Sequence, residues 1–173
     1  MTLYHYTTAR VEHLGSILRT GEIQTTDSLL FPESKLVPHP SGAGMMVVGV
    51  RPAPAVVWLT SDPELHLHPD RALWARRGSV NPTDDLGRVH ELRSEDDHLA
   101  IRITVEIRDS HVFRWESWAT NRGIAPDWME STKLTGGDWE RWYVIPRNIP
   151  RREWREILWT QTGEKTDPFG KPL

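Results

Sequence analysis

The sequence predicts an α+β domain in which a few short helices accompany a mixed or antiparallel β-sheet. Short apolar and β-branched segments recur at uneven intervals, helical patterns are few, and the regular strand–helix alternation of a doubly wound parallel sheet is absent. A length of 173 residues, with 38% hydrophobic and 26% charged residues, is typical of one globular domain with its own core. We expect that domain to span residues 1–162, and residues 163–173 to form a loose C-terminal tail.

The first expected elements are a strand and an amphipathic helix. Residues 2–7 (TLYHYT) are aromatic and β-branched, which favours a strand with His5 near its centre. Thr8 is the expected N-cap of the helix, and Gly21 its left-handed C-cap. The apolar residues between them recur at helical spacing: Val11, Leu14, Ile17 and Leu18.

The middle of the chain is less regular. Residues 25–54 contain five prolines and a turn of small residues, a composition that is typical of a lid or binding loop, with one short strand at residues 45–50. Residues 56–60 (VVWLT) predict a buried strand. Residues 64–98 are polar and are expected to consist mainly of loops.

The second half of the chain contains the clearest strand pattern. Apolar and polar residues alternate from Leu99 to Arg108, which predicts a strand with one buried and one polar face. Seven of the nine tryptophans lie between residues 115 and 159, where we expect most of them to fill the core. The other expected elements are helices at 115–122 and 126–131, a strand at 142–145, a helical turn after Pro150 and a strand at 157–160.

Composition excludes several classes of function. The chain has no cysteine, so it forms no disulfide, thiolate nucleophile or zinc–cysteine site. Its formal net charge of -3 provides no overall basic field for nucleic acid, although a local basic groove stays open. No apolar run approaches the roughly 20 residues of a membrane span, and the N-terminus lacks signal-peptide features. We therefore expect a cytoplasmic protein without a membrane partner.

The common catalytic motifs are absent. The chain contains no P-loop, GxGxxG, HExxH or GxSxG sequence. The best metal candidate is His66-x-His68-x-Asp70, because alternate residues of an extended segment point the same way. Two histidines without a third identified ligand are more typical of a solvated loop, so we expect no metal.

Three separated strands nevertheless carry polar groups that suit a ligand. His5 lies on the first strand, and the strand at 56–60 ends in the hydroxyls of Thr60 and Ser61. Glu140 precedes the strand at 142–145, and strand periodicity would place its carboxylate on the same face as Trp142. A histidine, two hydroxyls and a carboxylate form a plausible binding constellation, and three polar positions in a chain of this length also arise by chance.

The residues around His5 resemble the opening of ADP-ribosyltransferase-fold proteins. The likeness rests on residues 3–8 (LYHYTT) and on the pattern LxxILxxGxI at residues 14–23. It points in particular to DNA-targeting bacterial toxin transferases and to a group of small uncharacterised bacterial proteins. The latter group is also similar at residues 57–61 (VWLTS), 142–143 (WY) and 149–154 (IPRREW), so that the resemblance covers about a third of the chain.

The resemblance implies a split β-sheet with NAD+, as a substrate, in the cleft between its halves. In this family the histidine of the first strand hydrogen-bonds a ribose hydroxyl and orients NAD+, a role that corresponds to His5. Strand-end hydroxyls beside the nicotinamide correspond to Thr60 and Ser61. An aromatic side chain packs on the nicotinamide ring, and the candidates for this are Tyr6, Trp58 and Trp142.

Two further residues complete the expected contacts with NAD+. Thr7 follows Tyr6 on the first strand. Arg102 lies on the polar face of the alternating strand, where its guanidinium suits a bidentate contact with the diphosphate. An ordinary surface salt bridge is an equal alternative for Arg102.

The resemblance also implies a late-strand glutamate that stabilises positive charge at the sugar C1 as nicotinamide leaves. Alignment on the Ile149-Pro150 turn places that position near Trp142, and Glu140 lies two residues earlier, roughly 6–7 Å along an extended strand. Glu140 and His5 are therefore the expected catalytic residues, with Asp138 and Glu130 as alternatives to Glu140.

The sequence thus predicts an NAD+-dependent mono-ADP-ribosyltransferase, of the kind found among bacterial or phage toxins and conflict effectors. The alternative is a catalytically degenerate protein of the same fold that binds a nucleotide or a partner. A 2'-phosphotransferase reaction on RNA would need several arginines gathered at the cleft, and no spacing gathers them. The acceptor (protein, nucleic acid or small molecule) and the oligomeric state are open.

Overall fold

The computed structural model describes the whole chain except residues 27–33, 43, 50–52, 69–96, 109 and 136–138. Within the described residues, three short α-helices accompany β-strands whose pairings are all antiparallel. The helices are α1 (Val11–Thr20), α3 (Trp115–Asn121) and α4 (Pro126–Thr135). The expected α+β class with a predominantly antiparallel sheet is therefore confirmed.

Seven strands form the main sheet, in the order β11-β10-β6-β1-β5-β8-β7. They are β1 (Thr2–Thr7), β5 (Val57–Thr60), β6 (Ile101–Glu106), β7 (Phe113–Arg114), β8 (Trp142–Ile145), β10 (Trp154–Trp159) and β11 (Lys165–Thr166). Two smaller sheets pair β2 (Glu22–Ile23) with β9 (Ile149–Pro150) and β3 (Ser34–Pro38) with β4 (Met45–Gly49). Single 3-10 turns are η1 (Leu65–Leu67), η3 (Trp139–Arg141) and η4 (Arg151–Glu153).

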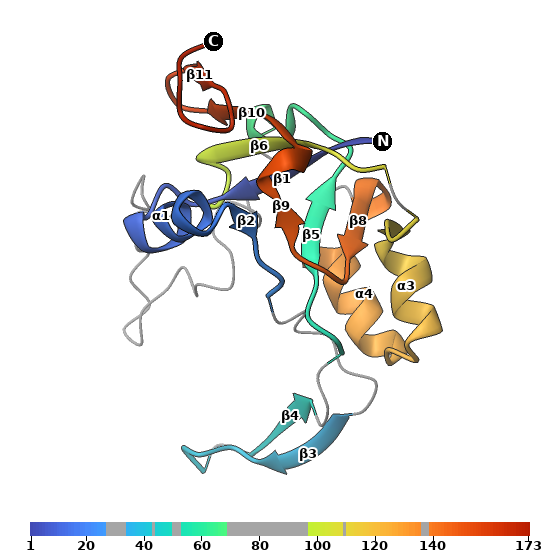
Figure 1. The fold of residues 1–173 in the computed structure, drawn as a ribbon. Helices are drawn as coiled ribbons and strands as arrows, with labels where there is room; N and C mark the ends of the chain where they lie inside the picture. Colours follow the sequence, from blue (N-terminus) through green and yellow to red (C-terminus); the bar gives the residue numbers. More distant parts are fainter. Residues whose placement is uncertain (27–33, 43, 50–52, 69–96, 109, 136–138) are drawn as a thin grey trace.

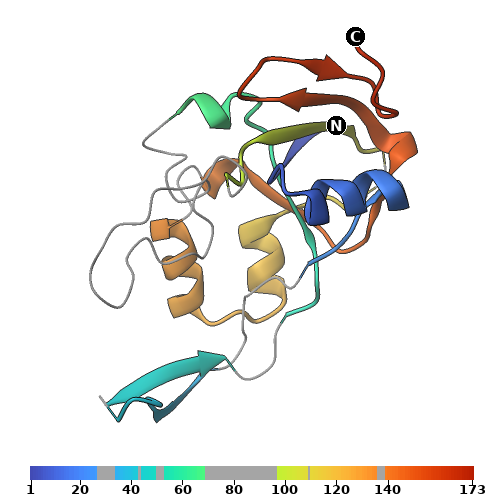
Figure 2. The ribbon, with the colours of Figure 1, turned by 90° about the vertical axis from the view of Figure 1, so that its left-hand side faces the viewer.

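The main sheet changes direction between β1 and β5. Only one register pair, Tyr4 with Thr60, joins these two strands, whereas six pairs join β1 to β6 and four join β5 to β8. In Figures 1 and 2, β6 lies across the direction of β5. We call this narrow β1–β5 contact the seam, because it divides the sheet into a β11-β10-β6-β1 part and a β5-β8-β7 part.

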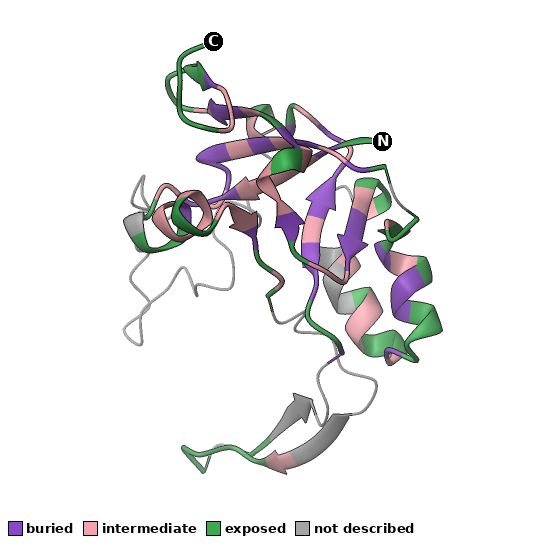
Figure 3. Ribbon diagram, in the orientation of Figure 1, coloured by how far each residue is buried: buried purple, intermediate pink, exposed green. Residues whose placement is uncertain are grey.

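Each face of the sheet has its own hydrophobic cluster. One cluster packs α1 on the sheet through Leu14, with Leu3 and Ile103 among its fully buried members. The other joins α3 to β8 through Trp115, Trp118 and Val144. The alternation predicted for residues 101–106 is seen directly as alternating buried and partly buried residues along β6 (Figure 3). The expected core role holds for Trp115, Trp118 and Trp154, which are at most 3% exposed.

The two ends of α1 differ in how well the sequence predicts them. Gly21 caps the C-terminus in the left-handed conformation with φ 69°, as expected. The N-terminus is different, because the helix begins at Val11 after Arg10 and has no side-chain cap. The Thr8 hydroxyl instead lies 3.4 Å from Nδ1 of His13.

Two segments contain more structure than the sequence indicated. Residues 25–54 include a β3–β4 hairpin, of which only the β4 strand was expected. The tail at residues 163–173, expected to be loose, contributes β11, which pairs with Leu158 and Ile157 of β10 and buries Thr166. A turn in which the Asp167 carboxylate accepts hydrogen bonds from two backbone N–H groups holds the chain after β11 in place.

Arg151 closes the C-terminus of α1, and we expect Arg151→Ala to lower the free energy of unfolding by about 1–2 kcal/mol. Its guanidinium donates to the Leu18 carbonyl, its backbone N–H donates to the Gly21 carbonyl at 2.8 Å, and its side chain lies over the Trp154 ring. Urea unfolding would measure the loss. The neighbouring exposed Arg152 provides a matched control, and an equal loss in Arg152→Ala would contradict this interpretation.

Candidate functional site

His5 occupies the seam. Its Nδ1 lies 3.1 Å from the carbonyl oxygen of Trp58 on β5, so the side chain bridges the two strands where the regular ladder stops. A carbonyl only accepts, so Nδ1 carries the proton and donates. Nε2 is then the acceptor nitrogen of the neutral ring, and no described residue hydrogen-bonds it.

Burial lowers the pKa of His5 from its ordinary value, and the hydrogen bond to the Trp58 carbonyl opposes part of that shift. The ring therefore stays neutral at pH 7. A neutral ring with Nδ1 fixed as donor presents Nε2 to a hydroxyl in one orientation, which is the requirement for positioning a sugar.

The same pKa shift makes stability depend on pH. Because the folded pKa lies below the unfolded value near 6.5, the unfolded chain takes up the proton first as the pH falls. We expect the free energy of unfolding to be fully maintained above about pH 6.5 and to fall on acidification below it. Urea unfolding at pH 7.5 and 5.5 would measure this, and His5→Gln should show a smaller decline. The control is His39→Gln, which changes an exposed histidine and should decline like the wild type. Equal declines in the wild type and in His5→Gln would contradict the interpretation.

Tyr6 and Arg102 join β1 and β6 to the segment after β5. The Tyr6 hydroxyl donates to the Pro63 carbonyl at 2.9 Å and lies 3.3 Å from Nδ1 of His66. Burial raises the pKa of the Tyr6 hydroxyl, which therefore stays protonated as a donor. Arg102 donates to the same Pro63 carbonyl at 2.5 Å. Both residues thus position the β5 end.

Arg102 is already paired inside the protein. Its guanidinium bonds Glu156 at 2.9 Å, and its side chain is only 11% exposed. Burial opposes ionisation of Glu156, but hydrogen bonds from Lys165 and Arg102 outweigh it and lower the pKa of that carboxyl. Of the two roles that the sequence left open for Arg102, this arrangement matches the salt bridge.

Polar side chains at the end of β5 accept hydrogen bonds from the backbone of the turn that follows. Thr60 is 4% exposed, and its Oγ1 accepts from the Asp62 N–H at 3.0 Å. Asp62 is 2% exposed, and its Oδ1 accepts from the Glu64 N–H at 2.9 Å. Ser61 is partly exposed between them, and its N–H donates to the Arg141 carbonyl at 2.9 Å. The Ser61 hydroxyl is therefore better exposed to a ligand than that of Thr60.

Three consecutive carbonyls of η3 are bonded by other elements. Trp115 Nε1 donates to the Trp139 carbonyl at 2.8 Å, an Arg114 guanidinium nitrogen donates to the Glu140 carbonyl, and Ser61 donates to the Arg141 carbonyl. The turn is thus held from α3, β7 and β5 at once. Glu140 is exposed on this fixed backbone beside the β5 end. A carboxylate on a rigid support is what transition-state stabilisation requires.

Glu140 does not lie on β8, contrary to the strand periodicity assumed from the sequence. It belongs to η3, and β8 begins at Trp142. The Glu140 carbonyl accepts a hydrogen bond from the Arg114 side chain and not from the backbone of a neighbouring strand. Of the alternative carboxylates, Asp138 falls outside the described residues, and Glu130 on α4 pairs with Lys133 at 3.1 Å.

The sheet distributes the candidate residues over its two faces. The register joins Tyr4, Thr60 and Trp142 in one row, so these side chains share a face, and Tyr6 and Trp58 share it by alternation. Trp142 and Trp58 contact each other there, with ring centroids 5.5 Å apart. His5 and the buried Thr7 alternate to the α1 face. At the seam, the His5 side chain bonds the backbone carbonyl of Trp58, whose own side chain lies on the other face of the sheet.

Sequence reasoning missed Asp62 and Arg141. Oδ2 of Asp62 is buried without a hydrogen bond, 3.4 Å from Arg141 Nη1 and 3.9 Å from His68 Nε2. A nearly inaccessible carboxylate beside two basic groups is unusual in a protein interior. Ser61-Asp62-Pro63 directly after a strand is a typical turn sequence, so Asp62 was interpreted as a turn residue and its burial was not predicted.

The metal candidate is divided between different contacts. His66 faces Tyr6, His68 faces Asp62, and Asp70 lies outside the described residues. Among the residues that the structure describes, no three histidine or acidic side chains gather as metal ligands would. Within the same residues, no helix has the length and apolarity that crossing a membrane requires.

Comparison with other proteins identifies no relative, since no family model, curated protein or solved structure matches this chain.

Proposed function

We propose that this protein is an NAD+-dependent mono-ADP-ribosyltransferase whose site lies at the β1–β5 seam. The observation that carries the proposal is the neutral His5 ring, fixed by the Trp58 carbonyl with Nε2 left as an acceptor. A ribose hydroxyl is a natural donor to such a nitrogen. The change of strand direction at the seam supports a split sheet of the kind that the sequence resemblance implies.

The proposed reaction breaks the glycosidic bond between the ribose C1 and the nicotinamide nitrogen. Nicotinamide leaves with the bonding electron pair, an acceptor nucleophile forms the new bond to C1, and the acceptor's proton passes to solvent or a nearby base. Positive charge develops at the sugar, and the Glu140 carboxylate is the proposed stabilising group. The acceptor is a protein, a nucleic acid or a small molecule, and in a toxin or conflict effector it would belong to the target cell.

A second function is favoured by the position of Glu140. Because this residue lies on η3 and not on the face of β8, a domain that binds a nucleotide or a partner without catalysis is the alternative. A domain that binds NAD+ without catalysis shares NAD+ binding with the transferase and differs in turnover, whereas a partner-binding domain shares neither property.

The direct test combines calorimetric titration of NAD+ with chromatographic detection of nicotinamide. We expect binding at micromolar to millimolar NAD+ and nicotinamide release that is enhanced by an acceptor, which protein, DNA, RNA and small-molecule mixtures would identify by class. Binding without release in any of these mixtures would select the non-catalytic alternative. Absence of binding at millimolar NAD+ would exclude the transferase and the domain that binds NAD+ without catalysis, and partner binding would then be the function left to test.

His5→Ala should weaken NAD+ binding roughly tenfold and abolish detectable nicotinamide release. The variant removes one hydrogen bond to the ribose, and a net loss near 1.4 kcal/mol corresponds to a factor of ten in affinity. Calorimetry would measure the affinity, with the exposed His39→Ala as the matched control. Unchanged binding and release in folded His5→Ala would place the site elsewhere.

A further inference from the structure

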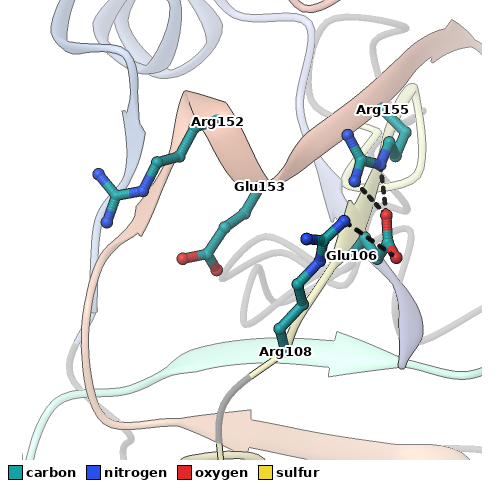
Figure 4. Close-up of a pocket in the computed structure, with 5 residues that line it drawn as sticks. All are labelled: Glu106, Arg108, Arg152, Glu153 and Arg155. Carbon is teal, nitrogen blue, oxygen red and sulfur yellow. Dashed lines mark hydrogen bonds and ion pairs between the residues drawn. The ribbon is translucent and has the colours of Figure 1, made fainter.

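A recess lies away from the seam, where β6, η4 and β10 meet. It has a volume of about 520 Å³ and is lined by Glu106, Arg108, Arg152, Glu153 and Arg155 (Figure 4). Every lining residue is charged. Glu106 pairs in register with Thr2, at the opposite end of β1 from Tyr6 and Arg102, so this recess is distinct from the proposed NAD+ site.

The carboxylates of the recess are already bound to arginines. Glu106 accepts from Nε of Arg155 at 2.6 Å and from a second nitrogen of the same guanidinium, an arrangement that lowers the pKa of that carboxyl. Glu153 accepts from Arg147 at 2.9 Å. Neither acid therefore presents an uncompensated negative charge to a ligand.

The arginines are the more accessible groups. The Arg108 and Arg155 side chains are 79% and 47% exposed, against 35% for Glu106 and 18% for Glu153. The guanidinium groups of Arg108 and Arg155 are thus more accessible to a ligand than the two carboxylates. The ion pair with Glu106 also holds Arg155 in one orientation, which reduces the entropy lost when it binds a ligand.

Two of the guanidiniums remain available for an additional anion. Arg152 is exposed, and no described residue pairs with it. Arg108 has only a long contact, 3.8 Å from Glu106. Arg108, Arg152 and Arg155 come from three different segments, which suits an anion with several oxygens.

We propose that this recess is a binding site for a phosphate-bearing ligand, with Arg108 and Arg152 as its main contacts. The arginine fork matches phosphate oxygens through paired N–H donors, and the recess volume lies within the range of small-molecule sites. The phosphates belong to a small diphosphate or to a polynucleotide backbone, which present the same chemistry to arginine. The site is independent of the proposed transferase function.

Calorimetric titration of the full chain with inorganic pyrophosphate at 50 mM salt tests the site. We expect measurable binding that weakens at least tenfold in the double variant Arg108→Ala/Arg152→Ala. Titration of a ten-nucleotide single strand of DNA separates the two sources, because tighter binding with a steep salt dependence would indicate a polynucleotide.

Two matched variants make the result specific. Arg122→Ala removes an exposed arginine outside the recess, and His5→Ala alters the seam, so both should bind pyrophosphate like the wild type. No binding by the wild type at millimolar pyrophosphate, or equal weakening in Arg122→Ala, would overturn the proposal. Because pyrophosphate lacks a nicotinamide and a ribose, failure here leaves the NAD+ tests intact, and failure of those tests leaves this one intact.

Discussion

Glu140→Gln is expected to lower the rate of nicotinamide release from NAD+ by a factor of about 10²–10³, while NAD+ affinity changes little. The amide keeps the size of the side chain and removes the negative charge that opposes the positive charge developing at the ribose C1. Removal of one preorganised electrostatic group from an active site typically has this magnitude. Because the charge develops only in the transition state, the loss should fall on kcat and not on KM.

The control for this variant is Glu164→Gln. Glu164 is another exposed glutamate, located between β10 and β11 at the far edge of the main sheet, and its loss should leave the rate unchanged. Equal rates in wild type and Glu140→Gln would show that Glu140 is not the catalytic carboxylate. The proposed chemistry would then need another carboxylate near the seam.

Glu140 also shows how far sequence reasoning reaches. Its position just before a strand at 142–145 was predicted from the sequence. Its nearness to the β5 end comes from the observed pairing of that strand with β5, whose register places Trp142 opposite Thr60. Its backbone conformation could not be predicted in this way. The 3-10 turn is held by Trp115, Arg114 and Ser61, which lie 24 to 80 residues along the chain from the carbonyls that they bond, and local periodicity contains no information about such contacts.

Elements determined by local chemistry were predicted well. The β6 alternation and the Gly21 cap depend on residues within a few positions, so their patterns are visible in the sequence. The hairpin strand β3 and the tail strand β11 were missed because each is short and defined by pairing with a partner strand. Strand pairing of this kind is a long-range property.

The seam itself lies between these two cases. The strand character of residues 2–7 was evident, and so was the histidine at its centre. What makes His5 distinctive is the single register pair beside it, which lets its side chain bond the Trp58 carbonyl. Asp62 is similar, because a turn-forming aspartate after a strand is common, while its burial against Arg141 is a tertiary feature.

Trp115→Phe should destabilise the protein by about 1–2 kcal/mol and loosen η3, because it removes the donor to the Trp139 carbonyl while keeping an aromatic side chain. Trp115→Ala should cost about 3–5 kcal/mol, since the side chain is 1% exposed in the α3 cluster. Urea unfolding measures the stability, and amide hydrogen exchange at residues 139–142 measures the loosening.

Trp118→Phe is the matched control, because the Trp118 indole is equally buried and its Nε1 makes no hydrogen bond. Removing that unsatisfied donor relieves a desolvation penalty, so its stability loss should be clearly smaller and exchange at η3 unchanged. If η3 supports a catalytic Glu140, Trp115→Phe also slows nicotinamide release although Trp115 itself is buried. Equal effects of the two phenylalanine variants on exchange at η3 would show that the Trp115–Trp139 hydrogen bond does not fix the turn.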